Sequence, residues 1–240
     1  MKALLVCMMV AGAAMAQTPV NKSYPVPANK KISLSFDYPQ LVKISTWDKN
    51  EISITGSVSI NGGESDNAFE LEQAVTDNTV RIENHIRNLK SLPHRITVYK
   101  GEEKIVFRSE ADYKKYCAET GSNFTMKSQG VDMDIVLEIK VPRGVETRLE
   151  CVYGLAEVRN FFGPLSVEAT YGGVDVSVQE STTGELGAET GYGQIYTNLD
   201  LTFTGTEVRD FHTRVIAKPG TGPRYSFESK YGNVYLRKAL

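Results

Sequence analysis

A ten-residue repeat occurs four times in the second half of the chain, and it limits the possible folds more than any other feature. Each copy has glutamate at its second position and Tyr-Gly at its centre, with tyrosines 18, 21 and 39 residues apart. A period near twenty residues is typical of repeat architectures, and we interpret the longest step as two periods from which one copy was lost or replaced. The copies, numbered repeats 1 to 4 in chain order, are Leu149–Val158, Val167–Val176, Ala188–Thr197 and Phe227–Leu236.

Side-chain alternation predicts a strand on each side of the Tyr-Gly centre. Before the tyrosine, apolar or small residues at positions 1 and 3 face inward, and after the glycine the apolar residues have the opposite parity. A one-residue slip within a single strand would expose them, so we predict that each glycine takes a positive φ and turns a corner. The structural repeat residues are Tyr153, Gly154, Tyr171, Gly172, Tyr192, Gly193, Tyr231 and Gly232.

Stacking the copies in register creates a column of glutamates and a column of tyrosines. The glutamates would lie about 4.8 Å apart, which is destabilising unless solvent, interleaved Lys and Arg, or a bound cation or basic partner relieves the repulsion. The tyrosines are expected on the inner side of the corners, packed with their hydroxyls on backbone, and the alternative is an exposed ladder that stacks on glycans. The outward column consists of Glu150, Glu168, Glu189 and Glu228.

One such unit cannot bury its apolar face alone, whereas a stack of units forms a continuous core. We therefore predict an all-β fold, and more specifically a parallel β-solenoid resembling a β-helix, with a β-sandwich as the alternative. Alternating runs predict further strands in residues 32–100, either as first rungs or as a packed cap. Residues 101–130 form an insertion with a short helix that starts after Ser109 and ends at Gly121, and residues 131–240 form the repeat region.

Residues 1–16 have the pattern of a secretory signal peptide, with Lys2 before an apolar run and Ala14-Met15-Ala16 as the cleavage site. Residues 17–31 are polar and contain prolines, which favours an extended leader. This apolar run is too short to span a membrane, and no second hydrophobic stretch follows it. Two cysteines remain after cleavage, and we favour a packed thiol at Cys151 over a disulfide between Cys117 and Cys151, with both alternatives open.

Charge and motifs exclude several classes of function. The net charge of −2 and the pI near 6.0 lack the electrostatic footprint of nucleic-acid binding. The chain has no G-x-S-x-G, S-x-x-K or H-E-x-x-H motif, so we predict no catalytic residue and no cofactor. Asp132 and Asp134 share a strand face and are weak candidates for Ca²⁺ ligands. The acidic loop at Glu64 and Asp66 is a second, separate candidate. The alternative is that these are ordinary solvated carboxylates.

Three parts of the chain resemble exported bacterial proteins classed as putative adhesins with β-strand repeats, a domain of unknown function. These parts are Val42–Ile54, Val141–Val145 and the four Tyr-Gly repeats, within a resemblance that spans residues 32–240. The resemblance implies a β-solenoid-like fold in the periplasm or on the surface of a Gram-negative bacterium, and no enzymatic activity.

We accordingly expect a non-catalytic cell-envelope protein with a binding, adhesion-like or scaffolding role, and an envelope protein or a glycan as its partner. The alternative is a polysaccharide-active enzyme on a β-helix, which would need clustered aspartates with Arg or Lys on one face. Four residues follow repeat 4, so we expect the segment 198–224, with strands at Leu199–Phe203 and Thr213–Ala217, to cover the last rung. Covering that edge would keep the protein monomeric.

Overall fold

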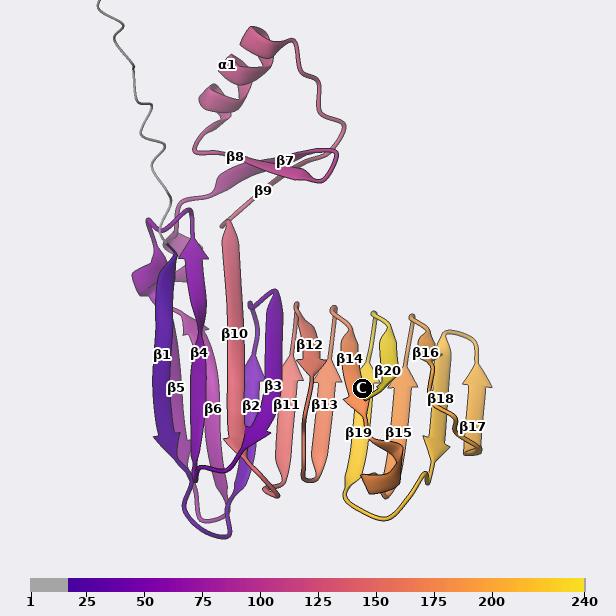
Figure 1. Cartoon of the computed structure of the whole chain (residues 1–240). Helices are drawn as coiled ribbons and strands as arrows, with labels where there is room; N and C mark the ends of the chain where they lie inside the picture. The colour runs from indigo at the N-terminus through magenta and orange to yellow at the C-terminus, as the bar shows by residue number, and fades with distance from the viewer. Residues whose placement is uncertain (1–16, 240) are drawn as a thin grey trace, which may run out of the picture.

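The computed structural model describes residues 17–239 and consists of two large β-sheets, one small sheet and one α-helix (Figure 1). Sheet A has eight strands in the order β1 (Thr18–Pro25), β4 (Glu51–Ile60), β10 (Met133–Pro142), β3 (Leu41–Trp47), β12 (Leu155–Val158), β14 (Val174–Val178), β20 (Val234–Lys238) and β16 (Ile195–Thr197). Sheet B has nine strands in the order β17 (Phe203–Arg209), β18 (His212–Ala217), β15 (Glu185–Thr190), β19 (Arg224–Ser229), β13 (Leu165–Ala169), β11 (Thr147–Cys151), β2 (Lys31–Phe36), β6 (Thr79–Ile86) and β5 (Phe69–Val75). The all-β prediction is confirmed.

One hydrophobic core fills the space between the two large sheets. It forms because alternate residues of each strand are apolar and turn to the same face, as in Leu34 of β2 and Ile54 of β4, which are fully buried. Short 3₁₀ turns at Asp66–Ala68, Leu89–Ser91 and Glu180–Thr182 link strands at the rim. None of the helices in residues 17–239 has the length and hydrophobicity of a membrane span.

The repeats use both large sheets, since the first half of each repeat is a strand of sheet B and the second half a strand of sheet A. Equivalent strands of neighbouring repeats pair in parallel, with no shift of register between them. The spatial order, however, is repeat 1, 2, 4, 3. Repeat 4 lies between repeats 2 and 3, so the interpretation of a lost copy is wrong.

The hairpin β17–β18 accounts for this order. After repeat 3 the chain forms the hairpin, and β18 pairs antiparallel with the outer side of β15. The chain then returns below the sheets, and β19 pairs in parallel with the other side of β15. The segment 198–224 therefore extends the edge of sheet B beyond repeat 3 and does not cover repeat 4. Its first strand begins at Phe203, so the predicted strand Leu199–Phe203 is also wrong.

Close approach, and not positive φ, explains the corner glycines. None of the four has a positive φ. A Cβ atom added to Gly172 would lie 1.8 Å from the carbonyl oxygen of Gly154, and one added to Gly232 would lie 2.2 Å from that of Gly172. The backbones of successive corners thus stack directly on each other, which only a residue without a side chain permits.

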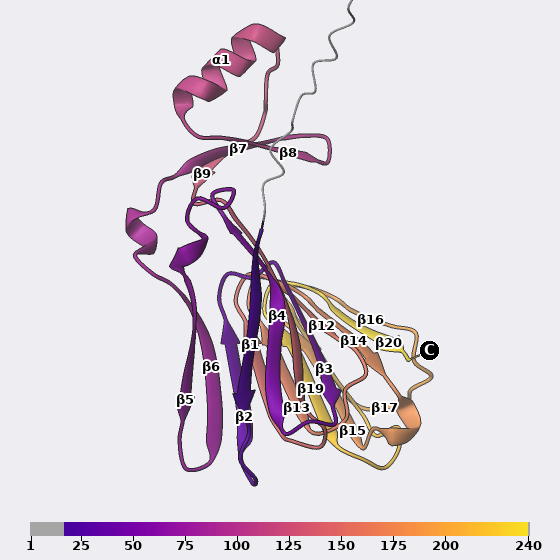
Figure 2. The same cartoon turned by 60° about the vertical axis from the view of Figure 1, so that its left-hand side comes forward.

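Residues 95–130 form a separate small sheet with β8 (Glu103–Phe107), β7 (Arg95–Lys100) and β9 (Lys127–Gly130), followed in space by helix α1 (Glu110–Thr120). The predicted helix is confirmed: the hydroxyl of Ser109 accepts a hydrogen bond from the amide of Asp112, and Gly121 ends the helix with φ 67°. A second, small core of Ile96, Val98 and Phe107 packs against α1. Figures 1 and 2 show this unit beyond the end of the two large sheets.

The segment predicted as an extended leader is an edge strand. β1 pairs antiparallel with β4 along its whole length, with Pro19 near its start and Pro25 at its end. The predicted signal peptide, residues 1–16, lies outside the described residues. Cys117 on α1 and Cys151 in the main core are both free thiols in this structure, and burial raises the pKa of Cys151 to about 12.

Candidate functional site

Six aromatic rings are stacked in one continuous line along the corners of the repeats. We call this line the aromatic row. Successive ring centroids are 5.1 to 6.1 Å apart, and adjacent repeat tyrosines are within 11° of parallel to each other. In spatial order the row consists of Tyr38, Tyr153, Tyr171, Tyr231, Tyr192 and Phe211.

The prediction that the repeat tyrosines pack on the inner side of the corners is wrong. Their exposed fractions range from 44% for Tyr231 to 61% for Tyr192. The inner side of two corners is already filled by small residues, because the hydroxyls of Thr190 and Ser229 accept hydrogen bonds from the amides of Gly193 and Gly232. The rings of the four repeat tyrosines instead turn outward and stack on their neighbours in the row.

A groove of about 530 Å³ lies where the aromatic row meets the small sheet. Two tyrosines of the row, Tyr38 and Tyr153, line it together with Tyr99 of β7, which is half exposed. Figure 1 shows the small sheet standing on the same side of the molecule as the corners of the repeats. The polar residues that line the groove are Gln40, Thr97, Lys104, Ser128, Gln129 and Asp132.

The glutamate column forms an unbroken line across four strands of sheet B, in the order Glu150, Glu168, Glu228 and Glu189. Arg148 contacts Glu150 at 2.7 Å and Glu168 at 2.9 Å, while His212 lies 2.9 Å and Arg214 3.6 Å from Glu189. Glu228, one of the two interior members, has no such cation within 4 Å among residues 17–239. Burial, and then the charges of Glu189 and Glu168, raise the pKa of Glu228 above its usual range.

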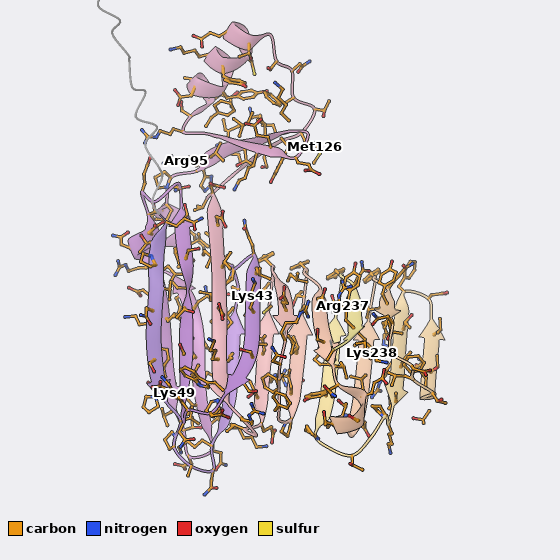
Figure 3. All side chains as sticks on the ribbon, viewed as in Figure 1. Lys43, Lys49, Arg95, Met126, Arg237 and Lys238 are labelled. Carbon is orange, nitrogen blue, oxygen red and sulfur yellow. The ribbon has the colours of Figure 1, made fainter. Side chains whose placement is uncertain are left out.

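Position 9 of the repeats carries a second line of side chains on the outer face of sheet A, which the sequence analysis missed. Asp175 of β14 accepts hydrogen bonds from Arg159 and from Arg237 of β20, each at 2.9 Å, and Figure 3 labels Arg237 on this face. Although burial alone would raise it, these two hydrogen bonds lower the pKa of Asp175. Asp175 is thus a paired anion that ties β20 to its neighbours and is unsuited to donating a proton. The line consists of Glu157, Asp175, Tyr235 and Tyr196. The sequence could have revealed it, because each of these residues occupies the ninth position of its repeat.

The predicted metal ligands do not converge. Asp132 forms an ion pair with Lys104, and Glu64 contacts Arg95 and Arg108. One carboxylate oxygen of Asp66 accepts a hydrogen bond from the amide of Ile60 at 2.6 Å. Within residues 17–239, no group of three or more His, Cys, Asp and Glu side chains has the arrangement of a metal site.

A hollow of about 980 Å³ lies on the outer face of sheet B. Serines of three strands line it, Ser33 of β2, Ser166 of β13 and Ser226 of β19. Four cations line it, and each contacts a carboxylate within 3.3 Å: Lys31 with Glu146, Arg81 with Glu83, Arg148 with Glu150 and Arg224 with Glu185. In contrast to these paired cations, the hydroxyls of the four repeat tyrosines have no hydrogen-bond partner among residues 17–239.

Comparison with known proteins gives two structural neighbours. A putative cell adhesion protein from Clostridium sporogenes has 12% sequence identity, with 92% of this chain and 100% of that chain covered and a TM-score of 0.43. A putative adhesin from Bacteroides fragilis has 11% identity, with 94% and 99% covered and a TM-score of 0.21. No family model and no curated protein matches the chain. At these identities and TM-scores, neither neighbour carries an argument about function.

Proposed function

We propose that the protein is an exported, non-catalytic binding protein of the cell envelope with an adhesion-like role, and that the aromatic row is its contact surface. The observation that supports this proposal is a line of six stacked rings that ends in a groove: Tyr38 at the groove is half-buried, and the other five rings are exposed. Exposed apolar surface of this extent on a soluble domain is typical of an interaction site.

The row combines rigidity with regular spacing. Each of the four interior rings is stacked between two neighbours. The corners beneath them are held by backbone hydrogen bonds such as Tyr171 N to Val152 O at 2.8 Å and Tyr231 N to Thr170 O at 2.9 Å. A ligand therefore orders few side chains when it binds, which keeps the entropic cost of binding low. Tyrosine suits this purpose because it offers a large contact area with only two rotatable side-chain bonds.

The repeat region is proposed to be a short parallel β-solenoid whose third rung, counted in space, is repeat 4. Parallel, in-register pairing of all four repeats in both sheets supports this description. We propose a monomer, because the edge strands have features that block pairing with another chain. β1 contains Pro19, Lys22 and Pro25, β16 has only three residues, and β17 has a register shift between Phe203 and Gly205.

The location in the periplasm or on the surface of a Gram-negative bacterium is part of the same proposal. It rests on the secretory pattern of residues 1–16 and on the resemblance to exported bacterial proteins.

Binding of the mature chain, residues 17–240, to isolated cell envelopes of the source bacterium tests the proposal. We expect sedimentation with the envelopes, and we expect the variant Tyr153→Ser/Tyr171→Ser/Tyr231→Ser to remain in the supernatant. The matched control is Tyr196→Ser/Tyr235→Ser, since these rings stack at 5.1 Å like those of the row but lie on sheet A. Equal sedimentation of both variants would refute a role of the row, and release of sugars from the envelopes would refute a non-catalytic role.

A further inference from the structure

We infer that the ligand of the aromatic row is a neutral, extended glycan that lies along the row with one sugar ring per tyrosine. This inference rests on the proposed binding function and adds the chemical class of the ligand. It is carried by three features of the row: the groups that it exposes, the distance between them, and the polar groove at its end.

The exposed groups are ring edges and hydroxyls. Each interior ring is stacked on both faces, so a ligand cannot slide between rings and must lie across their edges. Some tyrosine hydroxyls of this protein are occupied by the protein itself, as in Tyr225, which donates to the carbonyl of Phe161 at 2.9 Å. In the described part of the chain, no such partner bonds the hydroxyls of the four repeat tyrosines, and they are free to bond a ligand rich in hydroxyl groups.

The spacing of these hydroxyl-bearing rings favours a polymer with a matching period. Rings of the repeat tyrosines are 5.1 to 5.2 Å apart. An extended peptide advances about 3.4 Å per residue and presents every second side chain, so it falls out of step with the row. In an extended β-linked hexose chain, each sugar adds one pyranose ring and one glycosidic oxygen, a length that matches the 5.1 to 5.2 Å between the tyrosine rings.

An α-helix, with a pitch of about 5.4 Å, also approaches this period. The end of the row distinguishes the two ligands. A helix docks through an apolar stripe in a hydrophobic groove. The groove at Tyr38 is instead mixed: beside Leu89, Val131 and Met133 it is lined by two amides, two hydroxyls and an ion pair, from Gln40, Gln129, Thr97, Ser128 and Lys104–Asp132. These groups suit sugar hydroxyls.

The terminal ring adds a stacking platform. Tyr38 ends the row: among residues 17–239 its ring stacks on one aromatic neighbour, Tyr153, and this half-buried ring lines the groove. An apolar sugar face can pack on that ring while the amides bond its hydroxyls, which is how a pocket combines an apolar surface with a few orienting polar groups. The only charges in the groove, Lys104 and Asp132, neutralise each other among the described residues, so the glycan is expected to be neutral.

Calorimetry with linear β-linked hexaoses of glucose, xylose, mannose and N-acetylglucosamine, and with a coiled α-linked glucose hexaose, tests the period. We expect at least one β-linked hexaose to bind at least tenfold more tightly than its trimer and than the α-linked hexaose. The variant Tyr171→Phe/Tyr231→Phe keeps the stacked rings and removes two hydroxyls, so melting should be unchanged while affinity falls about two- to tenfold per hydroxyl. A drop in melting temperature with unchanged affinity would show that the row is purely structural.

Envelope binding separates this inference from the proposed function. Anhydrous hydrogen fluoride cleaves glycosidic bonds and leaves peptide bonds intact, while protease does the reverse. We expect row-dependent sedimentation to survive protease and to disappear after hydrogen fluoride. Loss after protease alone would overturn the glycan in favour of an envelope protein and leave the binding function standing. Sedimentation that does not depend on the row would overturn both.

Discussion

Replacing Gly172 with alanine should destabilise the protein because of a single steric contact. The new Cβ would lie 1.8 Å from the carbonyl oxygen and 2.4 Å from the carbonyl carbon of Gly154 in the neighbouring corner. Carbon and oxygen atoms in contact are normally about 3.3 Å apart, so the corners of repeats 1 and 2 must separate by about 1.5 Å. Because φ of Gly172 is not positive, backbone strain adds nothing to this cost.

The magnitude follows from the hydrogen bonds on both sides of that contact. Thr170 N to Cys151 O, Tyr171 N to Val152 O and Ala156 N to Gly173 O are 2.9, 2.8 and 3.0 Å long, and a shift of this size takes them past the range of good geometry. At about 1 kcal/mol each, the expected loss is about 3 kcal/mol of unfolding free energy. For a chain of this size the melting temperature should fall by about 6–12 °C.

Thermal or urea unfolding of the purified mature chain measures this change. Gly130→Ala is the matched control, since no atom lies within 4 Å of its added Cβ and it has no positive φ, and its melting temperature should change by less than about 2 °C. Equal shifts for both variants would refute direct stacking of the corners as the reason for glycine at this position.

Four further changes test other parts of the structure. Glu228→Gln should raise the melting temperature at pH 7, because the raised pKa of Glu228 means that its charge opposes folding; the difference should vanish as the pH falls toward 4 and the wild-type carboxyl becomes protonated. Asp175→Asn should cost about 1.5–3 kcal/mol through weakened bonds to Arg159 and Arg237; since the pKa of Asp175 is lowered, the wild type should lose this stability as the pH falls below about 4, and a difference that persists at pH 2 would contradict the ion pairs. A chain ending at Pro223 lacks β19 and β20, the strands of repeat 4 that lie between repeats 2 and 3 in the two sheets, and it should show no cooperative unfolding. A cooperative transition would mean that repeat 3 docks on repeat 2 directly. In native protein a thiol reagent should label Cys117 and spare the buried Cys151. Reductant should leave the melting temperature unchanged, whereas it would lower the melting temperature if the two cysteines formed a disulfide.

Local sequence patterns were sufficient to predict most strands and the helix. The alternation in Ile32–Phe36, Thr79–Ile86 and Met133–Val141 reports which face of a strand is buried, and strands lie at these positions in the structure. Ser109 and Gly121 predicted both ends of α1, because helix capping depends on residues within one turn. The positions of the glutamate column were also evident, since two-residue periodicity assigns a face to each side chain.

Contacts between distant segments decided the rest. The order of the repeats depends on where the hairpin β17–β18 returns the chain. β19 lies between β13 and β15 and pairs with both, but its own sequence pattern would equally suit a place beyond β15. In repeats 3 and 4 the hydroxyls of Thr190 and Ser229 occupy the inside of the corner, where the tyrosine was expected, and alternation within one strand does not report what fills a corner. Tyr38 and Phe211 belong to no repeat, and only the fold brings them to the two ends of the aromatic row. The sequence by itself therefore determined the repeating unit and its glycine, because these depend on neighbours along the chain, whereas the exposed row and its groove were decided by the tertiary structure, which sets how those units are ordered in space.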